Sequence, residues 1–309
     1  MDPTTLYRSA VLGIADAGMV KRLLKRNGWS MGVGRFVAGE DIRSAIPKLQ
    51  RIEASGKRVV LDLLGEFVAD EAAARASAAL VRQALAAAAA AGVEPYLSVK
   101  PTQLGLGVDP DLAFELSAAV AKDAAAVDGH LCLDMENSPN VDGTLILFER
   151  LRAAGWLNLS TVLQSYLYRT PDDLERLLAL SPTPAVRIVK GAYKEPPEVA
   201  LQRKAAVDEA FARLVARGLA VGGLVNIATH DERLLARLLA HIAAAGLGPE
   251  RYELQMLYGV RPALQDRLAA AGHTLRVYVP FGADWYGYFS RRLAERPANL
   301  AFVLRGLFG

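Results

Sequence analysis

From residue 58 onward, short apolar runs alternate with longer amphipathic stretches. The run Arg58–Gly65 is rich in valine and leucine, as a buried strand is. The stretch that follows it, Asp70–Ala91, is rich in alanine, arginine and leucine and stops at Gly92, which is typical of a helix that ends at a glycine. Repetition of this pair of elements predicts a parallel sheet that is covered by helices.

The same unit recurs to the end of the chain. The further predicted strands are Pro95–Lys100, His130–Glu136, Leu159–Ser165, Ala185–Lys190, Gly222–Thr229, Tyr252–Leu257 and Leu275–Pro280. The helices that follow them are Asp111–Val127, Gly143–Ala154, Asp172–Leu180, Pro197–Arg217, Asp231–Ala245, Pro262–Ala271 and a last helix that contains Tyr288–Pro297. Eight such units of roughly thirty residues are the number and the period of a closed (β/α)8 barrel. A doubly wound open sheet is the alternative, but the G-x-G-x-x-G turn that often follows its first strand is missing.

The residues before the first strand have a different pattern. Residues 5–55 are predicted to be helical, with a break at Asn27–Gly28 and a helix over Asp41–Ala54. We therefore expect an α/β protein with an N-terminal helical arm, residues 1–57, and a TIM-type barrel, residues 58–309. The last helix is expected to lie over the C-terminal mouth of this barrel.

Composition and charge exclude several classes of protein. The 36 basic residues are scattered among 33 acidic ones, so the net charge of +3 gives little support to nucleic-acid binding. A single cysteine, Cys132, excludes an internal disulfide and a multi-cysteine metal site, and it fits a reducing compartment such as the cytoplasm. The N-terminus has no signal-peptide pattern, and no apolar run reaches the ~18 residues of a membrane-spanning helix. The positive mean hydropathy still leaves room for peripheral membrane contact.

Polar residues gather where the predicted strands end. These residues include Lys100, Asp134, Met135, Glu136, Gln164, Arg187, Lys190, Gly191, Tyr193, Asn226, Thr229, His230, Asp231, Gln255, Tyr258 and Tyr278. In (β/α)8 barrels the active site lies at the C-terminal ends of the strands. Buried charges are costly unless they are paired or bind a ligand, so the pattern indicates a site at this mouth. Taken singly, Arg187 could instead face outward against a helix, Asp134 could be a strand-end carboxylate, and Asp231 could cap a helix.

The last helix carries a polar face of unusual composition. Tyr288, Arg291, Arg292 and Glu295 are spaced i, i+3, i+4 and i+7, so they share one face if the segment is helical. Two guanidiniums can bind a carboxylate, and Glu295 can receive an ammonium, which together would suit an amino acid. The alternative is a solvated helix with surface ion pairs that contribute little stability.

Three chemistries and one binding function compete at such a mouth. A metal-dependent hydrolase is weakly supported, because only His230 among the four histidines follows a strand. A lyase would use Lys100 or Lys190 to form an imine. A flavin-dependent oxidoreductase would use Gln164 and Arg187 to bind the flavin ring. A barrel that only binds a small molecule would not readily explain so many polar strand ends.

Six segments resemble the successive motifs of the proline dehydrogenase family. They are Leu133–Glu136, Val186–Tyr193, Thr229–His230, Leu254–Gly259, Arg276–Gly282 and Tyr288–Pro297, and they occur in the family's order. The resemblance extends over the barrel from Arg58 to Pro297 and is closest to the short, monofunctional bacterial form. It implies oxidation of L-proline to Δ1-pyrroline-5-carboxylate by hydride transfer to non-covalent FAD. It also implies a membrane quinone as electron acceptor, and thus contact with the inner face of the cell membrane.

The resemblance further implies a role for individual residues. Arg291 and Arg292 would hold the substrate carboxylate, with Lys100 and Glu295 in the surrounding ion-pair network. Tyr278 and Tyr288 would wall the proline ring, and Leu257 would contact it. Asp134 would lie near the substrate, and Arg187 near the reactive side of the flavin. The residues that would line FAD are Met135, Gln164, Val189, Lys190, Gly191, Ala192, Tyr193, Thr229, His230 and Gln255.

Overall fold

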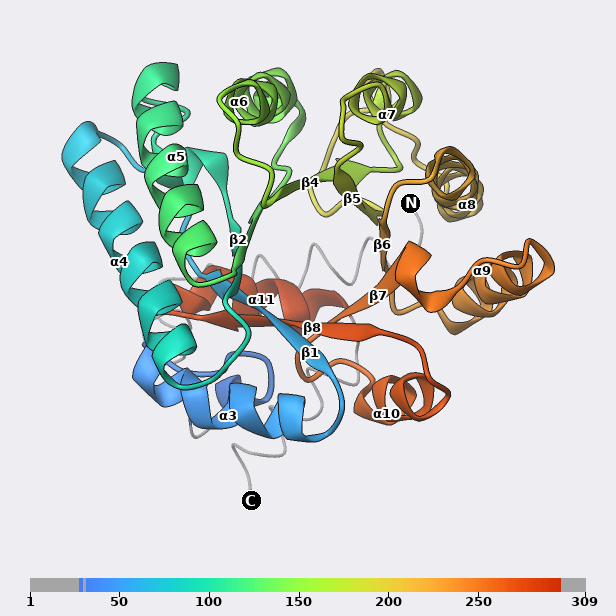
Figure 1. Cartoon of the computed structure of the whole chain (residues 1–309), viewed down its shortest axis with the longest axis horizontal. Coiled ribbons are helices and arrows are strands. Elements are labelled where there is room, and N and C mark those ends of the chain that lie inside the picture. Colours follow the sequence, from blue (N-terminus) through green and yellow to red (C-terminus); the bar gives the residue numbers. More distant parts are fainter. Residues whose placement is uncertain (1–27, 30–31, 296–309) are drawn as a thin grey trace.

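Eight parallel strands close into a barrel in chain order, β1 to β8 (Figure 1). The computed structural model of the chain describes residues 28–29 and 32–295. The strands are β1 (Arg58–Leu63), β2 (Tyr96–Val99), β3 (His130–Leu133), β4 (Leu159–Gln164), β5 (Ala185–Val189), β6 (Val225–Ala228), β7 (Tyr252–Leu257) and β8 (Leu275–Phe281). Pairing of β1 with β8 in register from Arg58 with Arg276 to Leu63 with Phe281 closes the ring. The predicted (β/α)8 barrel is therefore confirmed.

Helices between the strands form the outer layer of the barrel (Figure 1). They are α4 (Glu71–Ala90), α5 (Pro110–Ala126), α6 (Val141–Ala153), α7 (Thr170–Leu178), α8 (Lys204–Val221), α9 (Glu232–Ala244) and α10 (Pro262–Ala270). Carboxylate caps begin three of them, because Asp70, Asp109 and Asp231 accept hydrogen bonds from backbone N–H groups of the first turns. Asp231 therefore caps α9, which is one of the two roles that the sequence allowed for it.

Both predicted bounds of helix α8 differ from the structure. The helix begins at Lys204 and not at Pro197, and it ends at Val221 and not at Arg217. The backbone before it pairs instead with the loop after β4, where Leu201 N–H donates to Tyr166 O and Tyr168 N–H donates to Val199 O. Consecutive prolines at 196 and 197 disfavour a helix there, because each lacks a backbone donor and restricts the residue before it.

Two helices complete the barrel in different ways. Helix α3 (Ile42–Ala54) packs against β1, β8 and α4 and takes the place in the outer ring between α4 and α10 (Figure 1). Helix α11 (Trp285–Glu295) follows β8 and packs on the short 3₁₀ helix η1 (Val33–Arg35) and on Leu64, just beyond the C-terminal end of β1. The proposed boundary between arm and barrel at residues 57 and 58 stays a prediction. The helices expected within residues 5–27 lie outside the described residues.

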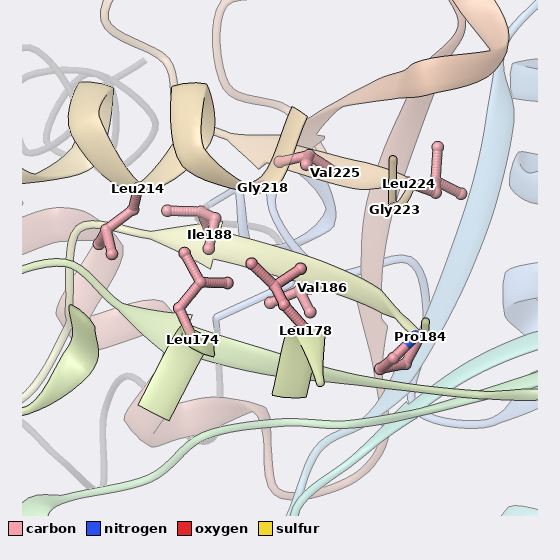
Figure 2. Close-up of a pocket in the computed structure, with 10 residues that line it drawn as sticks. All are labelled: Leu174, Leu178, Pro184, Val186, Ile188, Leu214, Gly218, Gly223, Leu224 and Val225. Atoms are coloured by element: carbon pink, nitrogen blue, oxygen red, sulfur yellow. The ribbon is translucent and has the colours of Figure 1, made fainter. Parts of the chain in front are cut away.

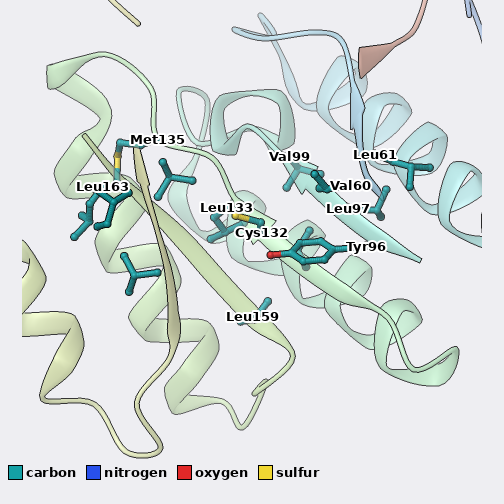
Figure 3. Packing of buried hydrophobic residues seen from close by; sticks show 14 of the residues in the cluster. Val60, Leu61, Tyr96, Leu97, Val99, Cys132, Leu133, Met135, Leu159 and Leu163 are labelled. Atoms are coloured by element: carbon teal, nitrogen blue, oxygen red, sulfur yellow. The ribbon is translucent and has the colours of Figure 1, made fainter. Parts of the chain in front are cut away.

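The apolar core lies between the strands and the helices. Leu61, Leu97, Val99, Leu133 and Leu159 alternate along their strands with inward residues and pack in this layer (Figure 3). The lumen of the barrel is filled differently. Its inward positions include charged and hydroxyl side chains, where branched aliphatic residues are usual. This polar lumen positions the candidate site.

Arginine–carboxylate pairs link neighbouring outer helices in an unbroken series from α4 to α10. The pairs are Arg75–Glu115, Arg150–Asp111, Arg176–Glu149, Arg217–Glu175, Arg237–Glu209 and Arg267–Glu232. Isolated exposed pairs contribute little, but a connected series of them stabilises more as temperature rises. We refer to the six pairs as the arginine belt.

The arginine belt predicts thermal stability that depends on salt. Raising NaCl from about 10 mM to about 1 M shortens the Debye length roughly tenfold, so it should lower the melting temperature by several degrees. Differential scanning calorimetry measures this change. A double variant, Arg217→Gln with Glu175→Gln, lacks one link and should lose less stability with salt. An equal salt response in the two proteins would contradict a role for the belt.

Candidate active site

Four side chains meet in the lumen of the barrel, three from strands and one from the residue that directly follows a strand. The Arg187 guanidinium on β5 lies 2.7 Å from Asp134, which directly follows β3. Ser98 on β2 donates to the same carboxylate oxygen of Asp134 at 2.5 Å. The Tyr278 hydroxyl on β8 donates to the other oxygen at 2.6 Å. Of these strands only β2 and β3 are neighbours in the ring, so the contacts that Arg187 and Tyr278 make with Asp134 cross the lumen and show that Arg187 faces inward.

The Asp134 carboxylate is fully engaged by these partners. Arg187 also stacks over the Tyr278 ring, with 5.4 Å between the guanidinium carbon and the ring centroid. Burial, with Asp134 and Asp62 close by, raises the pKa of the Tyr278 phenol. Tyr278 therefore stays a neutral hydrogen-bond donor over the physiological pH range.

Lys100 extends the cluster toward β1. Its ammonium lies 3.3 Å from the Asp62 carboxylate. Burial by itself would lower the pKa of Lys100, but Asp62 and Asp134 outweigh this effect and raise the pKa above its usual value. Lys100 therefore carries its charge. A lysine held in this state is a poor nucleophile, because imine formation needs the neutral amine.

Arg187 has unused hydrogen-bonding capacity. Its Nε and Nη2 groups are buried and have no acceptor among the described residues. The side-chain oxygen of Gln255 on β7 is likewise buried without a donor in that part of the chain, while its amide donates to Glu253. Buried polar groups are rarely left unsatisfied, so these atoms indicate a ligand or ordered water in the lumen.

The remaining residues of the predicted cofactor set surround the strand ends. Gln164 donates to the backbone oxygen of Glu136 at 2.8 Å, and Met135 is buried in the main hydrophobic core (Figure 3). His230 accepts a hydrogen bond from Leu257 N–H at 2.8 Å, so its Nε2 carries no proton. Thr229 accepts from Asp231 N–H at 3.2 Å.

The segment after β5 continues this ring of strand ends. Val189, Gly191 and Tyr193 are half-buried, and Ala192 is exposed. Gly191 has a φ of 120°, and an added Cβ would lie 2.4 Å from the Tyr166 ring, so glycine is needed here. Lys190 pairs with Asp208 at 2.5 Å and with Asp231 at 3.1 Å.

Helix α11 brings its arginines toward β1. Arg291 lies 3.7 Å from Glu66 in the loop after β1. Arg292 lies over the Tyr288 ring, 5.0 Å from its centroid. Tyr288 is buried in the same apolar cluster as Phe289, although its spacing had placed it on the polar face. Glu295 ends α11, and its side chain lies outside the described residues.

Several residues of the cluster were missing from the predicted set. Ser98, Asp62 and Glu66 each contact a predicted site residue. The alternation in Tyr96–Lys100 was a usable signal, because it places Ser98 on the same side of β2 as Lys100. Glu66 follows its strand in a loop, so no periodicity indicated it.

An apolar pocket elsewhere in the structure does not contribute to this cluster. It lies between β5, α7 and α8, on the helix side of the sheet (Figure 2). Its lining includes Leu174, Leu178, Val186, Ile188, Leu214 and Gly218. With no charged or hydroxyl side chain in it, the pocket has no means to orient a polar substrate.

Comparisons with known proteins agree with this geometry. The family model described as "Proline dehydrogenase" matches residues 45–305. Proline dehydrogenase of Deinococcus radiodurans is 45% identical over 98% of both chains. The chain belongs to the proline dehydrogenase family. Proline dehydrogenase 2 of Bacillus subtilis strain 168 is 36% identical over 98% of this chain and 99% of its own. The predicted family and its oxidoreductase class are therefore confirmed.

Solved structures of longer proteins share the barrel. Proline utilization A (PutA) of Bdellovibrio bacteriovorus superposes with a TM-score of 0.80 at 22% identity, over 94% of this chain and 36% of that one. PutA of Bradyrhizobium japonicum gives a TM-score of 0.73 at 25% identity, over 88% and 32%. This proline dehydrogenase family member therefore spans about a third of the length of those chains.

A second polar layer lies beneath the site. Arg276 on β8 pairs with Glu253 at 2.7 Å and with Glu94 at 2.9 Å, and it stacks on Tyr96. Beside Tyr96, His130 contacts the Ser160 hydroxyl at 2.8 Å. Burial, with help from Arg276 and Arg187, lowers the pKa of His130 to about 3.

His130 predicts a loss of stability in acid. Between pH 6.5 and about 3 the unfolded chain binds a proton at His130 that the folded chain does not bind. Stability should therefore fall as pH decreases, by up to about 1.4 kcal/mol per pH unit from this group. Urea unfolding of the native protein and of His130→Asn at several pH values measures the difference. Parallel pH profiles for the two proteins would contradict the assignment.

Proposed function

We propose that this chain oxidises L-proline to Δ1-pyrroline-5-carboxylate with non-covalent FAD as hydride acceptor. The observation that supports this most is the hydrogen bonding of the buried Arg187. Asp134 and Ser98 both bind its Nη1, and its Nε and Nη2 have no acceptor among the described residues. A fixed cation of this kind suits a ring that gains negative charge when it is reduced. Membership of the proline dehydrogenase family supports the same reaction.

The residues present fit the flavin. Arg187 and Gln255 offer buried donors and an acceptor that lack partners in the described part of the chain, as the polar edge of a flavin requires. We propose that Met135, Gln164, Val189 to Tyr193, Thr229 and His230 line the rest of the cofactor. When bound, FAD would supply the acceptor for the hydride that leaves the ring carbon of proline, and the ring nitrogen would release its proton to solvent.

The substrate would bind between the barrel mouth and α11. We propose that Arg291 and Arg292 hold its carboxylate as two planar forks. Tyr278, Tyr288 and Leu257 would then wall its ring, with Lys100 and Glu295 in the network around it. Holding the carboxylate end determines where the far carbon of the ring lies, and such positioning contributes several kcal/mol to catalysis, on the order of 7 or more in the best cases.

Asp134 would act by positioning its partners. Both of its oxygens accept hydrogen bonds, from Arg187 and Ser98 on one and from Tyr278 on the other. These three contacts support a role in which the carboxylate holds its donors in place. We therefore propose that it holds Arg187 and Tyr278 at fixed places beside the bound substrate and cofactor.

A lysine-imine lyase is the other candidate, and two observations oppose it. Lys100 has a raised pKa beside Asp62, and Lys190 lies between two carboxylates. Both amines are held in ion pairs, whereas an imine-forming lysine needs an amine that is free to attack the substrate. Borohydride treatment would trap a substrate on Lys100 or Lys190 only if the protein were a lysine-imine lyase.

The reduced cofactor must pass its electrons on. We propose a membrane quinone as acceptor and a cytoplasmic protein in peripheral contact with the inner face of the membrane. Among the residues that the structure describes, no helix is both long and apolar enough to cross a bilayer. Proline-dependent reduction of a quinone in lipid vesicles, with flotation of the protein on the same vesicles, tests both parts.

The decisive experiment is anaerobic titration of the purified yellow protein with L-proline. We expect the flavin absorbance to bleach, with pyrroline carboxylate as product. Cyclopentanecarboxylate is the matched control, because it keeps the carboxylate and the ring but has no amine to oxidise. A protein that binds FAD and stays yellow with saturating proline would overturn the proposed function.

A further inference from the structure

Ser98 contacts both members of the central ion pair. Its hydroxyl donates to Asp134 Oδ1 at 2.5 Å and accepts from Arg187 Nη1 at 3.0 Å. The same Nη1 donates to the same Asp134 oxygen at 2.7 Å, which closes a triangle of three hydrogen bonds. Ser98 is fully buried, and it lies on β2, across the lumen from β5.

This triangle determines the orientation of a planar group. The hydrogens of Nη1 lie in the guanidinium plane, so two acceptors for this nitrogen restrict the plane more than one acceptor does. Asp134 and Ser98 are these two acceptors, and they lie side by side, 2.5 Å apart. Without Ser98, only the bond to Asp134 and the stacking on Tyr278 would hold the guanidinium. The direction of Nε and Nη2, which have no acceptor among the described residues, depends on this plane.

We propose that Ser98 is a positioning residue, which aims the free N–H groups of Arg187 at the bound cofactor. This inference rests on the proposed flavin function. The hydroxyl itself is oriented by Asp134, because donation to that carboxylate leaves a lone pair of Ser98 facing Arg187. Ser98 thereby couples the adjacent strands β2 and β3 to β5, which pairs with neither of them.

The test compares Ser98→Ala, which removes the hydroxyl, with Ser98→Thr, which keeps it. Ser117→Ala is the matched control, since Ser117 is equally buried on α5 and its hydroxyl has no partner in the described part of the chain. In Ser98→Ala we expect a more negative flavin midpoint potential and a limiting rate of flavin reduction that is roughly tenfold lower. The KM for proline should stay nearly constant, and Ser98→Thr should recover most of the rate.

A second measurement does not need the reaction. In ¹⁵N spectra of the apoprotein, the Nη1 hydrogens of Arg187 should give a resolved pair of signals that Ser98→Ala loses. Unchanged potential and unchanged arginine signals in Ser98→Ala would overturn the inference. A loss of flavin content together with a lower melting temperature in Ser98→Ala, with the arginine signals intact, would also overturn the inference. Such a result would indicate a purely structural role for Ser98. If wild-type protein binds FAD but is not reduced by proline, the proposed function fails while the arginine signals still test Ser98.

Discussion

Arg187→Lys should slow the reduction of bound flavin by proline about a hundredfold. The lysine ammonium can still pair with Asp134 across the lumen, so the buried carboxylate keeps a partner. Two features of the guanidinium are lost, however. The Nε and Nη2 donors, which meet no acceptor in the described part of the chain, disappear, and a compact charge replaces the planar group that stacks on Tyr278. The fixed positive charge that stabilises the reduced ring is thereby displaced.

Anaerobic stopped-flow reduction measures this effect, and the flavin midpoint potential should become more negative in parallel. Arg152→Lys is a suitable control, because Arg152 is also a buried arginine but donates to Pro182 O on the outside of the barrel. A wild-type reduction rate in Arg187→Lys would remove the assigned role of Arg187. Equal slowing in both variants would attribute the effect to general destabilisation.

Arg291→Lys and Arg292→Lys should each raise the KM for proline by at least roughly tenfold. A lysine offers a point charge, whereas an arginine offers two parallel N–H donors that match a carboxylate. Both side chains lie on α11 and are half-buried, with Arg291 beside Glu66 and Arg292 over Tyr288. A substrate carboxylate would there be shielded from water, which strengthens its interaction with the arginines.

Steady-state kinetics separate this effect from a change in flavin chemistry. The limiting reduction rate at saturating proline should change much less than KM, and the affinity for cyclopentanecarboxylate should fall to the same extent as KM rises. Arg267→Lys is the control, since Arg267 pairs with Glu232 on the surface of α10. Unchanged proline kinetics in both α11 variants would remove the carboxylate-binding assignment.

The fold was largely accessible from sequence because its signals are local. A buried parallel strand and an amphipathic helix each occupy a window of fewer than about twenty residues, and the alternation of the two defines the barrel. Errors occurred where a long-range contact overrides a local pattern. The segment before Lys204 was predicted to be the start of a helix, yet it pairs with the loop after β4. Likewise, α3 contributes to the ring around the barrel, which its sequence does not indicate.

The site was accessible in part for the same reason. The predicted strands placed Asp134, Arg187 and Tyr278 toward one mouth of the barrel, although in the structure Arg187 and Tyr278 lie in the middle of β5 and β8. The structure brings these three into direct contact. The structure places Lys190 between the carboxylates of Asp208 and Asp231, and a cofactor role alone does not predict these ion pairs. The roles of the substrate and cofactor residues stay predictions that the variants above test.

The sequence by itself thus determined the barrel, the order of its strands and the family to which the chain belongs. Tertiary structure alone decided which partners Asp134 has. Ser98, Asp134, Arg187 and Tyr278 are far apart in the chain, and their strands do not all pair with one another. Their side chains meet only because the closed ring directs alternate residues of every strand into one lumen. From that closure follow the single nitrogen by which Asp134 and Ser98 hold Arg187 and the two N–H-bearing groups that meet no acceptor among residues 32–295.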